Sequence, residues 1–484
     1  MEENLKKKYE KEKDKLSTRL GYLQRVLKDY KVPVMIVFEG VHAAGKGRLS
    51  NELLIALDPR YTKFYATHSP TESELRRPFL WQYFKNTPSS TAVTIFYRSW
   101  YSLYIAMKNG TVKNERYNGN KILLEEIRKF EKTMVDNGTE LLKFYIEIDK
   151  DLQKEHIMRM YDNPRTMWKA QEYDRDNDEE YKKEMEEILE EDEKSWIRVE
   201  YENRYKSVIE VLEIVVDKLE KRVKEEKKKA EADKPDNDGF FNGKFPNILE
   251  KYEGKEDIDK DEYKDRLIRL QKEMRDVQYT LYEKKIPLIL VYEGWDAAGK
   301  GGNIKRVVQQ LDPTGYEINT TAAPSDVEIK HHYLWRFWNT VPKTGHISIY
   351  DRSWYGRVMV ERVEGFAFNE DVKRAYDEIN DFEKSLVNFG AIVIKFFIHI
   401  SKEEQLERFE ARQEDEDKVW KITEEDWRNR EKWDLYQEAI NDMLDKTSTE
   451  NAPWYVINGN SKKFARIKAM ETILDTCYKA FIDK

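Results

Sequence analysis

Residues 294–301, Gly-Trp-Asp-Ala-Ala-Gly-Lys-Gly, have the types and spacing of a phosphate-binding loop. They follow an apolar segment, 288–292, that is expected to be a strand, and they precede an expected helix over 302–311. Glycines at such a turn let successive backbone N–H groups and the helix N-terminus point at phosphate oxygens, and the lysine adds a positive charge. The pattern predicts a phosphate cradle, and its residues are Gly294, Ala297, Ala298, Gly299, Lys300 and Gly301.

Two aspartates of this half are candidate oxygen ligands for a metal ion. The position after the lysine, where such loops normally carry the Ser or Thr hydroxyl that binds Mg²⁺, is Gly301. Asp296 lies inside the loop, and Asp351 ends the next expected strand. Because Mg²⁺ prefers carboxylate and phosphate oxygens, we expect Asp296 and Asp351 to hold it. The alternative role for Asp351 is that of a helix N-cap.

Basic residues crowd the same two regions of the sequence. Lys305 and Arg306 lie in the first turns of the loop helix, and Arg352, Arg357 and Arg362 follow the second strand. The spacing of Arg352 and Arg357 does not place both on one helical face. This is more positive charge than the phosphates of a nucleotide need, so the pattern favours a long polyanionic ligand. For any single one of these residues the alternative is a solvated helix charge.

The chain contains an internal duplication. Residues 34–47 match residues 288–301, and residues 98–101 match residues 352–355, in both cases 254 positions apart. Later pairs such as Trp168 and Trp420 match 252 positions apart. A charged helix that breaks down into Pro, Asp, Asn and Gly covers 218–245 and marks the boundary. The sequence predicts two domains, 1–235 and 236–484, with the cut near Asp236.

The two halves show the same succession of expected elements. Each begins with a long amphipathic helix, marked by Leu16, Leu20, Leu23 and Leu27 in the first half. Each continues with the apolar strand before the glycine-rich turn and with two further apolar strands, at 92–99 and 140–148 or at 346–353 and 391–400. Continuous apolar strands that alternate with helices indicate a parallel sheet covered on both faces. The predicted fold class is therefore α/β, with two tandem P-loop domains of three layers, α/β/α.

Composition excludes several classes of protein. The longest apolar runs are far shorter than the ~18 residues of a membrane span, and residues 1–16 lack an apolar signal region. Cys477 is the single cysteine of the sequence, which excludes an internal disulfide and a cysteine zinc site. The net charge of -8 weighs against a nucleic-acid partner. We expect a cytoplasmic protein with neither membrane nor nucleic acid among its partners.

Five segments of the chain resemble the second-type polyphosphate kinase family. They are 293–301 (EGWDAAGKG), 333–338 (YLWRFW), 351–365 (DRSWYGRVMVERVEG), 419–421 (VWK) and 452–457 (APWYVI). The resemblance covers both halves, and the tandem arrangement is similar to the polyphosphate:AMP phosphotransferases of that family. It implies a P-loop core with a helical lid, and phosphoryl transfer between inorganic polyphosphate and a nucleotide with Mg²⁺.

The resemblance also implies roles for individual residues. Asp296 and Asp351 would arrange the metal and the acceptor phosphate, and Arg357 would neutralise charge on the transferring group. Polyphosphate would be held by Lys300, Lys305, Arg306 and Arg352. The lid would be the segment around Arg408, Arg412, Lys418 and Lys421. A closing lid would exclude water and so favour transfer over hydrolysis.

The first half has lost the acidic part of this site. His42 stands at the position of Asp296, Tyr97 at that of Asp351, and Leu103 at that of Arg357. We therefore expect 1–235 to be non-catalytic and to serve as structure or as a secondary polyphosphate-binding surface. It is expected to pack on the second half as one subunit of a homodimer packs on another.

Four functions remain open from the sequence. Transfer from polyphosphate to AMP, which forms ADP, is favoured by the tandem form. The nearest alternative is the same chemistry with ADP as acceptor, which forms ATP. An ATP-dependent nucleotide kinase and a non-catalytic polyphosphate-binding protein are the other two. The sequence leaves open whether the assembly is a homodimer or a monomer whose halves imitate one.

Overall fold

The computed structural model describes residues 2–114, 116–117, 120–173, 178–231, 241, 243–254, 256–416, 420 and 422–483. The chain divides into two compact units. The first consists of Met1–Thr71, Leu80–Lys234 and Ser325–His332, and the second of Glu72–Phe79, Pro235–Pro324 and Tyr333–Lys484. The predicted cut near Asp236 lies outside the described residues.

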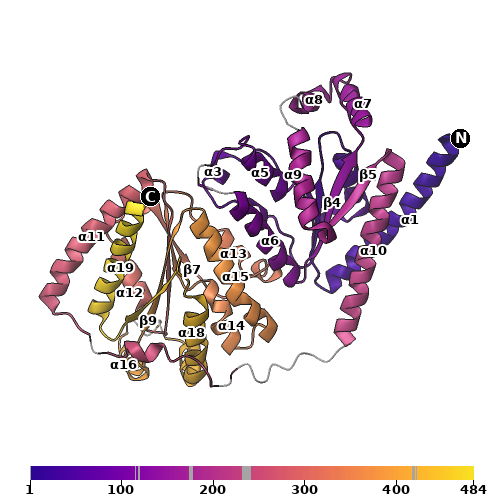
Figure 1. Cartoon of the computed structure of the whole chain (residues 1–484). Helices are drawn as coiled ribbons and strands as arrows, with labels where there is room; N and C mark the ends of the chain where they lie inside the picture. Colours follow the sequence, from indigo (N-terminus) through magenta and orange to yellow (C-terminus); the bar gives the residue numbers. More distant parts are fainter. Residues whose placement is uncertain are drawn as a thin grey trace. The chain divides into compact units, whose positions relative to one another are not determined.

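The described part of the first unit contains a five-stranded sheet in the order β2-β3-β1-β4-β5, in which every pairing is parallel (Figure 1). Its strands are β1 (Val34–Glu39), β2 (Thr62–Ala66), β3 (Val93–Tyr97), β4 (Glu140–Ile148) and β5 (Trp196–Tyr201). The central strand β1 is buried at every position, as expected for a strand covered on both faces. The sequence predicted β1, β3 and β4, but it missed β2 and β5.

Helices cover both faces of this sheet. The longer ones are α1 (Glu2–Asp29), α2 (Lys46–Ala56), α5 (Trp100–Lys108), α6 (Asn120–Asp136), α7 (Lys150–Tyr161), α9 (Asp178–Glu191) and α10 (Arg204–Glu231). Two shorter ones are α4 (Trp81–Phe84) and α8 (Met167–Tyr173). Helices α1, α2 and α10 share one hydrophobic core with the sheet. The predicted apolar stripe of α1 is confirmed, since Leu16, Leu20, Leu23 and Leu27 are all buried in that core.

The second unit repeats the topology of the first. Its described residues form a parallel sheet of five strands in the order β10-β9-β6-β8-β7, which is the same order read from the other edge. The strands are β6 (Leu288–Gly294), β7 (Tyr316–Thr320), β8 (Ile347–Asp351), β9 (Ile392–His399) and β10 (Trp454–Asn458). Strand β6 lies between β8 and β9, where connections leave the sheet in opposite directions, so a crevice for ligands opens at its carboxyl end.

The helices of the second unit form two layers around its sheet (Figure 1). One layer contains α11 (Lys260–Glu283), α12 (Lys300–Val308) and α19 (Lys462–Asp483). The other contains α14 (Val360–Val363), α15 (Asn369–Asn388) and α18 (Trp433–Thr447). The remaining helices are α3 (Glu72–Leu75), α13 (Trp335–Trp338), α16 (Lys402–Gln413) and α17 (Glu424–Glu431). The predicted three-layer α/β/α fold is confirmed in both units.

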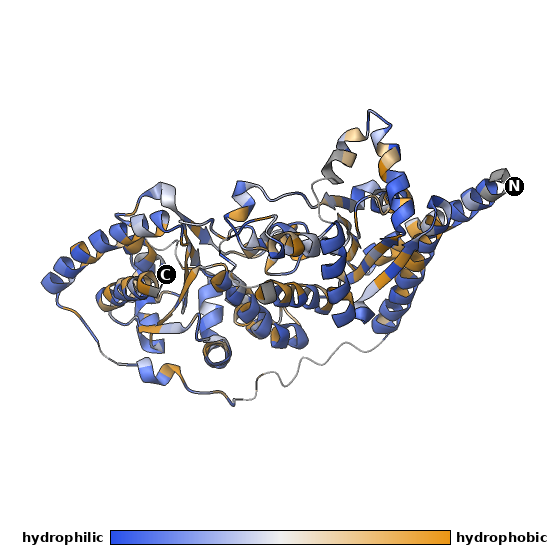
Figure 2. Cartoon of the chain, turned by 45° about the horizontal axis from the view of Figure 1, so that its top comes forward, coloured by the Kyte–Doolittle hydropathy of each residue, from blue (hydrophilic) through white to orange (hydrophobic). Residues whose placement is uncertain are grey.

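Hydrophobic residues concentrate on the strands, while hydrophilic and hydrophobic colours alternate along the long helices (Figure 2). In α11 the buried residues Leu270, Met274, Val277 and Leu281 follow the helical repeat, so one face packs and the other meets solvent. None of the helices in the described part of the chain combines the length and the apolar character that crossing a bilayer requires.

Candidate active site

The glycines of the loop after β6 have backbone conformations that other residues adopt with strain. Gly294 has φ +148° and lies so close to β9 that a Cβ atom would sit 2.5 Å from the carbonyl oxygen of Ile398. Gly299, at φ +105°, is the N-cap of α12. The loop therefore turns tightly at the carboxyl edge of the sheet and leads directly into the helix N-terminus, as predicted. Helix α12 begins at Lys300, two residues earlier than the sequence suggested.

Lys300 lies within the cradle and is surrounded by charged groups. Its Nζ donates hydrogen bonds to the carbonyl oxygens of Gly294 (2.8 Å) and Trp295 (3.2 Å). Burial and the neighbouring Arg352 lower the pKa of Lys300, and the carboxylates of Asp296 and Asp351 oppose this shift. The structure thus brings together the predicted lysine, both predicted carboxylates and the predicted arginine around one loop.

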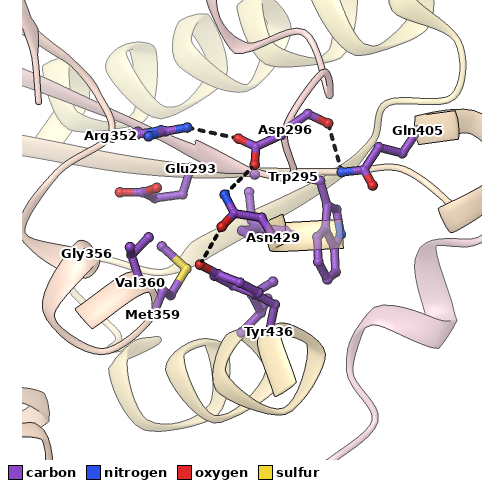
Figure 3. Close-up of a pocket in the computed structure, with 13 residues that line it drawn as sticks. Glu293, Trp295, Asp296, Arg352, Gly356, Met359, Val360, Gln405, Asn429 and Tyr436 are labelled. Atoms are coloured by element: carbon purple, nitrogen blue, oxygen red, sulfur yellow. Dashed lines mark hydrogen bonds and ion pairs between the residues drawn. The ribbon is translucent and has the colours of Figure 1, made fainter. Parts of the chain in front are cut away.

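Asp296 is held from three directions (Figure 3). Arg352 Nη2 donates to its Oδ1 (2.9 Å), and Asn429 Nδ2, from α17, donates to its Oδ2 (3.0 Å). Gln405 Nε2, from α16, donates to its backbone carbonyl oxygen (3.1 Å). Burial favours the neutral form of Arg352, but Asp296 and Glu293 outweigh it and the pKa of Arg352 is raised. The ion pair orients Arg352 towards the loop at a backbone φ of +63°.

Asp351 ends β8, as predicted, and its carboxylate faces the start of the loop helix. A Cβ atom on Gly301 would lie 3.8 Å from Asp351 Oδ2, so the residue that replaces the usual Ser or Thr leaves room beside this carboxylate. The described residues supply no hydrogen bond to the Asp351 carboxylate, whereas both oxygens of Asp296 are engaged. They also contain no cluster of three or more metal-ligating side chains. This donor set fits Mg²⁺, which is commonly held by one or two carboxylates together with substrate phosphates.

The other predicted basic residues divide into two groups. Lys305 is exposed, and Arg306 and Arg357 are half-buried. Arg357 pairs with Glu361 (3.0 Å) and lies over the ring of Tyr333 (4.5 Å to the centroid). Arg362 does not belong with them. Its side chain is 2% exposed and pairs with Asp442 (2.8 Å) and Glu438 (3.6 Å), so the prediction that Arg362 binds phosphate was wrong.

The predicted lid residues also differ from expectation. Arg408 is buried, and its guanidinium donates to the carbonyl oxygens of Ala297 (2.9 Å), Ala298 (3.0 Å) and Gly459 (2.6 Å). It anchors the loop itself, so it is not a mobile lid residue. Arg412 ends the same helix and is half-buried. Lys418 and Lys421 lie outside the described residues.

A pocket beside the loop is lined by candidate site residues that the sequence did not identify (Figure 3). Besides Asn429 and Gln405, its lining includes Glu293, Tyr436 and Trp295. Burial raises the pKa of Glu293, which accepts a hydrogen bond from Ser353 Oγ (2.7 Å). The indole of Trp295 stacks on that of Trp433, with centroids 3.6 Å apart. Glu293 directly precedes the loop in the sequence, and this adjacency is the one sequence feature that could have indicated its position in the site.

The corresponding site of the first unit has different side chains on the same frame. His42 contacts Asp178 (3.3 Å) and Arg98 (3.0 Å), in place of the Asp296–Arg352 pair. Glu39 accepts hydrogen bonds from Ser99, Ser102 and Tyr181, the last at 2.6 Å. Lys46 Nζ donates to the carbonyl oxygens of Gly40 (2.5 Å) and Val41 (2.7 Å). The lysine and the glycines are retained, while the two carboxylates are replaced.

Comparison with known proteins identifies the family. The family model described as Polyphosphate kinase 2 matches the chain twice, over residues 3–227 and 257–483. The chain belongs to the polyphosphate kinase 2 family.

Relatives within the polyphosphate kinase 2 family share the whole tandem arrangement. The chain is 37% identical to the polyphosphate:AMP phosphotransferase of Pseudomonas aeruginosa, over 98% of this chain and 96% of that protein. It is 35% identical to the polyphosphate:AMP phosphotransferase of Acinetobacter johnsonii, over 91% and 90%. The crystal structure of a putative polyphosphate kinase 2 from Pseudomonas aeruginosa superposes with a TM-score of 0.83 at 35% identity, over 99% of this chain and 97% of that one.

Proposed function

We propose that this chain transfers the terminal phosphoryl group of inorganic polyphosphate to AMP, which forms ADP, and that the second unit performs the reaction. One observation carries the proposal. The loop of the second unit brings Lys300, Arg352 and the carboxylates of Asp296 and Asp351 together at the carboxyl edge of the sheet. The choice of AMP rests on full-length relatives named polyphosphate:AMP phosphotransferase.

The reaction exchanges one phosphoanhydride bond for another. A phosphate oxygen of AMP attacks the terminal phosphorus of polyphosphate, and the bond from that phosphorus to the bridging oxygen breaks. The electron pair stays on the chain, which becomes one phosphate shorter. Because such transfer depends on positioning and charge stabilisation, the proposed tasks of the loop amides, Lys300 and Arg352 are to bind and orient the reacting phosphates. Arg357 would neutralise charge on the transferring group.

Mg²⁺ is part of the proposal. Asp351 would be its principal protein ligand and Asp296 the second, with substrate phosphates completing the set. When bound, the ion would neutralise the negative charge that builds up on the phosphate oxygens. The hydrogen bonds from Arg352 and Asn429 fix the orientation of Asp296 in this arrangement.

The proposed role of the first unit is structural. His42 and Tyr97 provide no carboxylate at the two metal positions, so its cradle lacks the groups that phosphoryl transfer requires. The support for this division is chemical: the residues that differ between the units are those that would contact metal and phosphate.

The decisive experiment is nucleotide chromatography after the full chain is mixed with Mg²⁺, long-chain polyphosphate and either AMP or ADP, without ATP. The expected result is rapid formation of ADP from AMP and little ATP from ADP. Formation of ATP from ADP alone would move the chain to the other acceptor. Activity that appears with ATP as the only effective donor would refute polyphosphate as the substrate. Removal of Mg²⁺ with a chelator is expected to stop the reaction.

A further inference from the structure

Three basic residues lie on one flank of the cradle without an acidic partner. Arg412 is near the end of α16, Lys462 is the first residue of α19, and Arg466 follows one turn later. Across the described ranges of the chain, none of the three forms an ion pair with a carboxylate. Arg466 contacts a neutral group, the hydroxyl of Tyr263, to which its Nη1 donates a hydrogen bond (3.3 Å).

Arg408 fixes these residues next to the loop. Its guanidinium bonds the loop carbonyls on one side and the carbonyls of Gly459 (2.6 Å) and Asn460 (3.1 Å) on the other. Those two residues lie two and three positions before α19, which begins at Lys462, so the start of α19 is held against the cradle. Arg466 Nη2 lies 3.3 Å from the position that a Cβ atom on Gly302 would occupy, in the first turn of α12.

The cluster has a marked excess of positive charge. Partial burial and the charges of Arg408, Arg412 and Arg466 lower the pKa of Lys462. Glu404 opposes that shift, but it already pairs with Arg408 (2.6 Å). The mutual repulsion of these like charges costs free energy that a multiply charged anion would relieve, so the arrangement favours a ligand with several negative charges in a row.

The first unit keeps a basic residue at one of these four positions. At the offset of 252 residues, Arg408 corresponds to His156 and Arg412 to Met160. When the first residues of α10 and α19 are aligned, Lys462 corresponds to Arg204 and Arg466 to Val208. Val208 is a core residue, 1% exposed. The first unit has other basic residues on this flank, Arg48, Arg159 and Arg204 around Tyr201, but Arg48 pairs with Glu52 (3.2 Å) and Arg159 with Glu155. The larger excess of charge without carboxylate partners therefore lies in the unit that retains Asp296 and Asp351. The polar loop anchor itself persists in reduced form, because the ring of His156 contacts the carbonyl oxygen of Ala43 (3.0 Å).

We infer that Arg412, Lys462 and Arg466 form a track for the part of the polyphosphate donor that extends beyond the cradle, and that this track produces a preference for long donor chains. The inference rests on the proposed function of the second unit. The three residues bind and position the donor at a distance from the reacting atoms. In this proposal the cradle supplies most of the contacts to a short donor such as tripolyphosphate, whereas a long chain also gains the attraction of all three residues, which salt screens.

The test is a comparison of donors of increasing chain length, from tripolyphosphate to long-chain polyphosphate, in the full-length protein at fixed AMP and Mg²⁺. The variant Lys462→Ala/Arg466→Ala is expected to raise the KM for long chains about tenfold, as loss of hydrogen bonds to charged groups predicts, and to change kcat and the KM for tripolyphosphate less than about twofold. Arg412→Ala is expected to act in the same direction. The advantage of long chains should also fall with added salt in the wild type and less so in the double variant.

Lys463→Ala is the matched control, because Lys463 lies on the same helix but pairs with Asp257 (3.5 Å). It should behave as wild type, and thermal melting should show that all variants remain folded. A wild type without chain-length preference, or equal KM increases for short and long donors, would overturn the inference. If no donor supports transfer to AMP, the proposed function fails. Calorimetric binding of polyphosphates of different lengths would then decide on the track separately.

Discussion

The two phosphate-binding loops have nearly the same backbone and different side chains. The first glycine has φ +142° in one unit and +148° in the other, and the residue after the third strand, Arg98 or Arg352, has φ +57° or +63°. Even the alanines, Ala43 and Ala297, share a left-handed conformation, at +55° and +62°. The shape of the cradle therefore follows from the fold, and its presence does not by itself indicate catalysis.

Both units keep a buried polar network that holds the frame together. A buried lysine pairs with a buried glutamate in each: Lys143 with Glu131 (2.7 Å) and Lys395 with Glu383 (2.7 Å). In each, the tryptophan after the third strand donates its indole N–H to that glutamate. This retained lysine–glutamate–tryptophan network is structural in both units. Lys300 and Arg352 are retained as well, as Lys46 and Arg98, so the proposed loss of catalysis in the first unit is assigned to the replaced residues Asp296, Asp351 and Arg357.

The largest expected loss of activity follows from removal of one of the two carboxylates of the second unit. Asp351→Asn keeps the size of the side chain but removes its charge, so Mg²⁺ loses its proposed anionic protein ligand. Since a metal contributes several kcal/mol of charge stabilisation, we expect kcat to fall by about 10³-fold or more, as measured by ADP formation from AMP and polyphosphate. Asp296→Asn should also abolish transfer.

The matched change in the first unit is His42→Ala, at the position of Asp296. It should leave kcat within about twofold of wild type, because the proposed reaction does not use this site. A loss comparable with that of Asp296→Asn would show that the first unit also turns over, and the division between the units would be wrong.

The fold was predictable where strands are buried on both faces. The six central strands, β1, β3, β4, β6, β8 and β9, are short and mostly apolar, and the sequence predicted all of them. The missed strands are the edge strands of the two sheets. In β2 and β7 no residue is buried, and β5 and β10 mix buried with partly exposed positions, so hydrophobic pattern alone did not distinguish them from loops.

The site was predictable where its residues are neighbours in sequence. The loop, Asp351 and Arg352 follow directly from strands, so local pattern placed them. Asn429 contacts Asp296 although the two residues are 133 positions apart in the sequence, and no local sequence pattern predicts that contact. Arg362 was misassigned because its charge suggested a ligand, whereas its partner Asp442, 80 residues on, makes it part of the interior. Residue type indicates chemistry, but burial decides whether a ligand can reach it.

A second comparison concerns the buried lysines Lys143 and Lys395, which should contribute equally to the stability of their own units. Lys395→Met and Lys143→Met each leave a glutamate buried without its cation, which typically costs about 3 kcal/mol or more. Hydrogen exchange of peptides from each unit in the full chain measures the free energy of opening of that unit. Each variant should destabilise its own unit, and only Lys395→Met should reduce phosphoryl transfer. A much smaller loss for one of them would show that the two networks are not equivalent.

A third comparison uses pH, because the second unit has a buried histidine where the first has Glu147. His399 Nδ1 accepts a hydrogen bond from Trp295 Nε1 (3.0 Å), and burial lowers the pKa of His399 from 6.5 to about 4. The unfolded state takes up a proton below about pH 6.5 and the folded state only near pH 4, so stability is lost as the pH falls through this window. The loss should reach about 3 kcal/mol.

The variant His399→Asn retains an acceptor for the indole and does not titrate in this range. Opening free energies of the second unit, measured by urea-dependent hydrogen exchange at several pH values, should fall less steeply towards pH 4 in the variant than in the wild type. Other histidines contribute to the wild-type slope and to that of the variant alike, so the difference between them belongs to His399. Identical slopes would contradict the assignment.

The smallest expected effect concerns the loop of the first unit, where the Tyr181 side chain forms hydrogen bonds inside the site. Its hydroxyl donates to Glu39 Oε2 (2.6 Å) and accepts from the backbone N–H of Gly40 (3.1 Å). Tyr181→Phe removes both bonds and leaves a buried carboxylate and a backbone donor less satisfied, which should destabilise the first unit by about 1–2 kcal/mol. Phosphoryl transfer should not change. If Tyr181→Phe instead increased polyphosphate binding at the first unit, then this cradle is blocked by one hydroxyl and not disabled by the loss of its carboxylates.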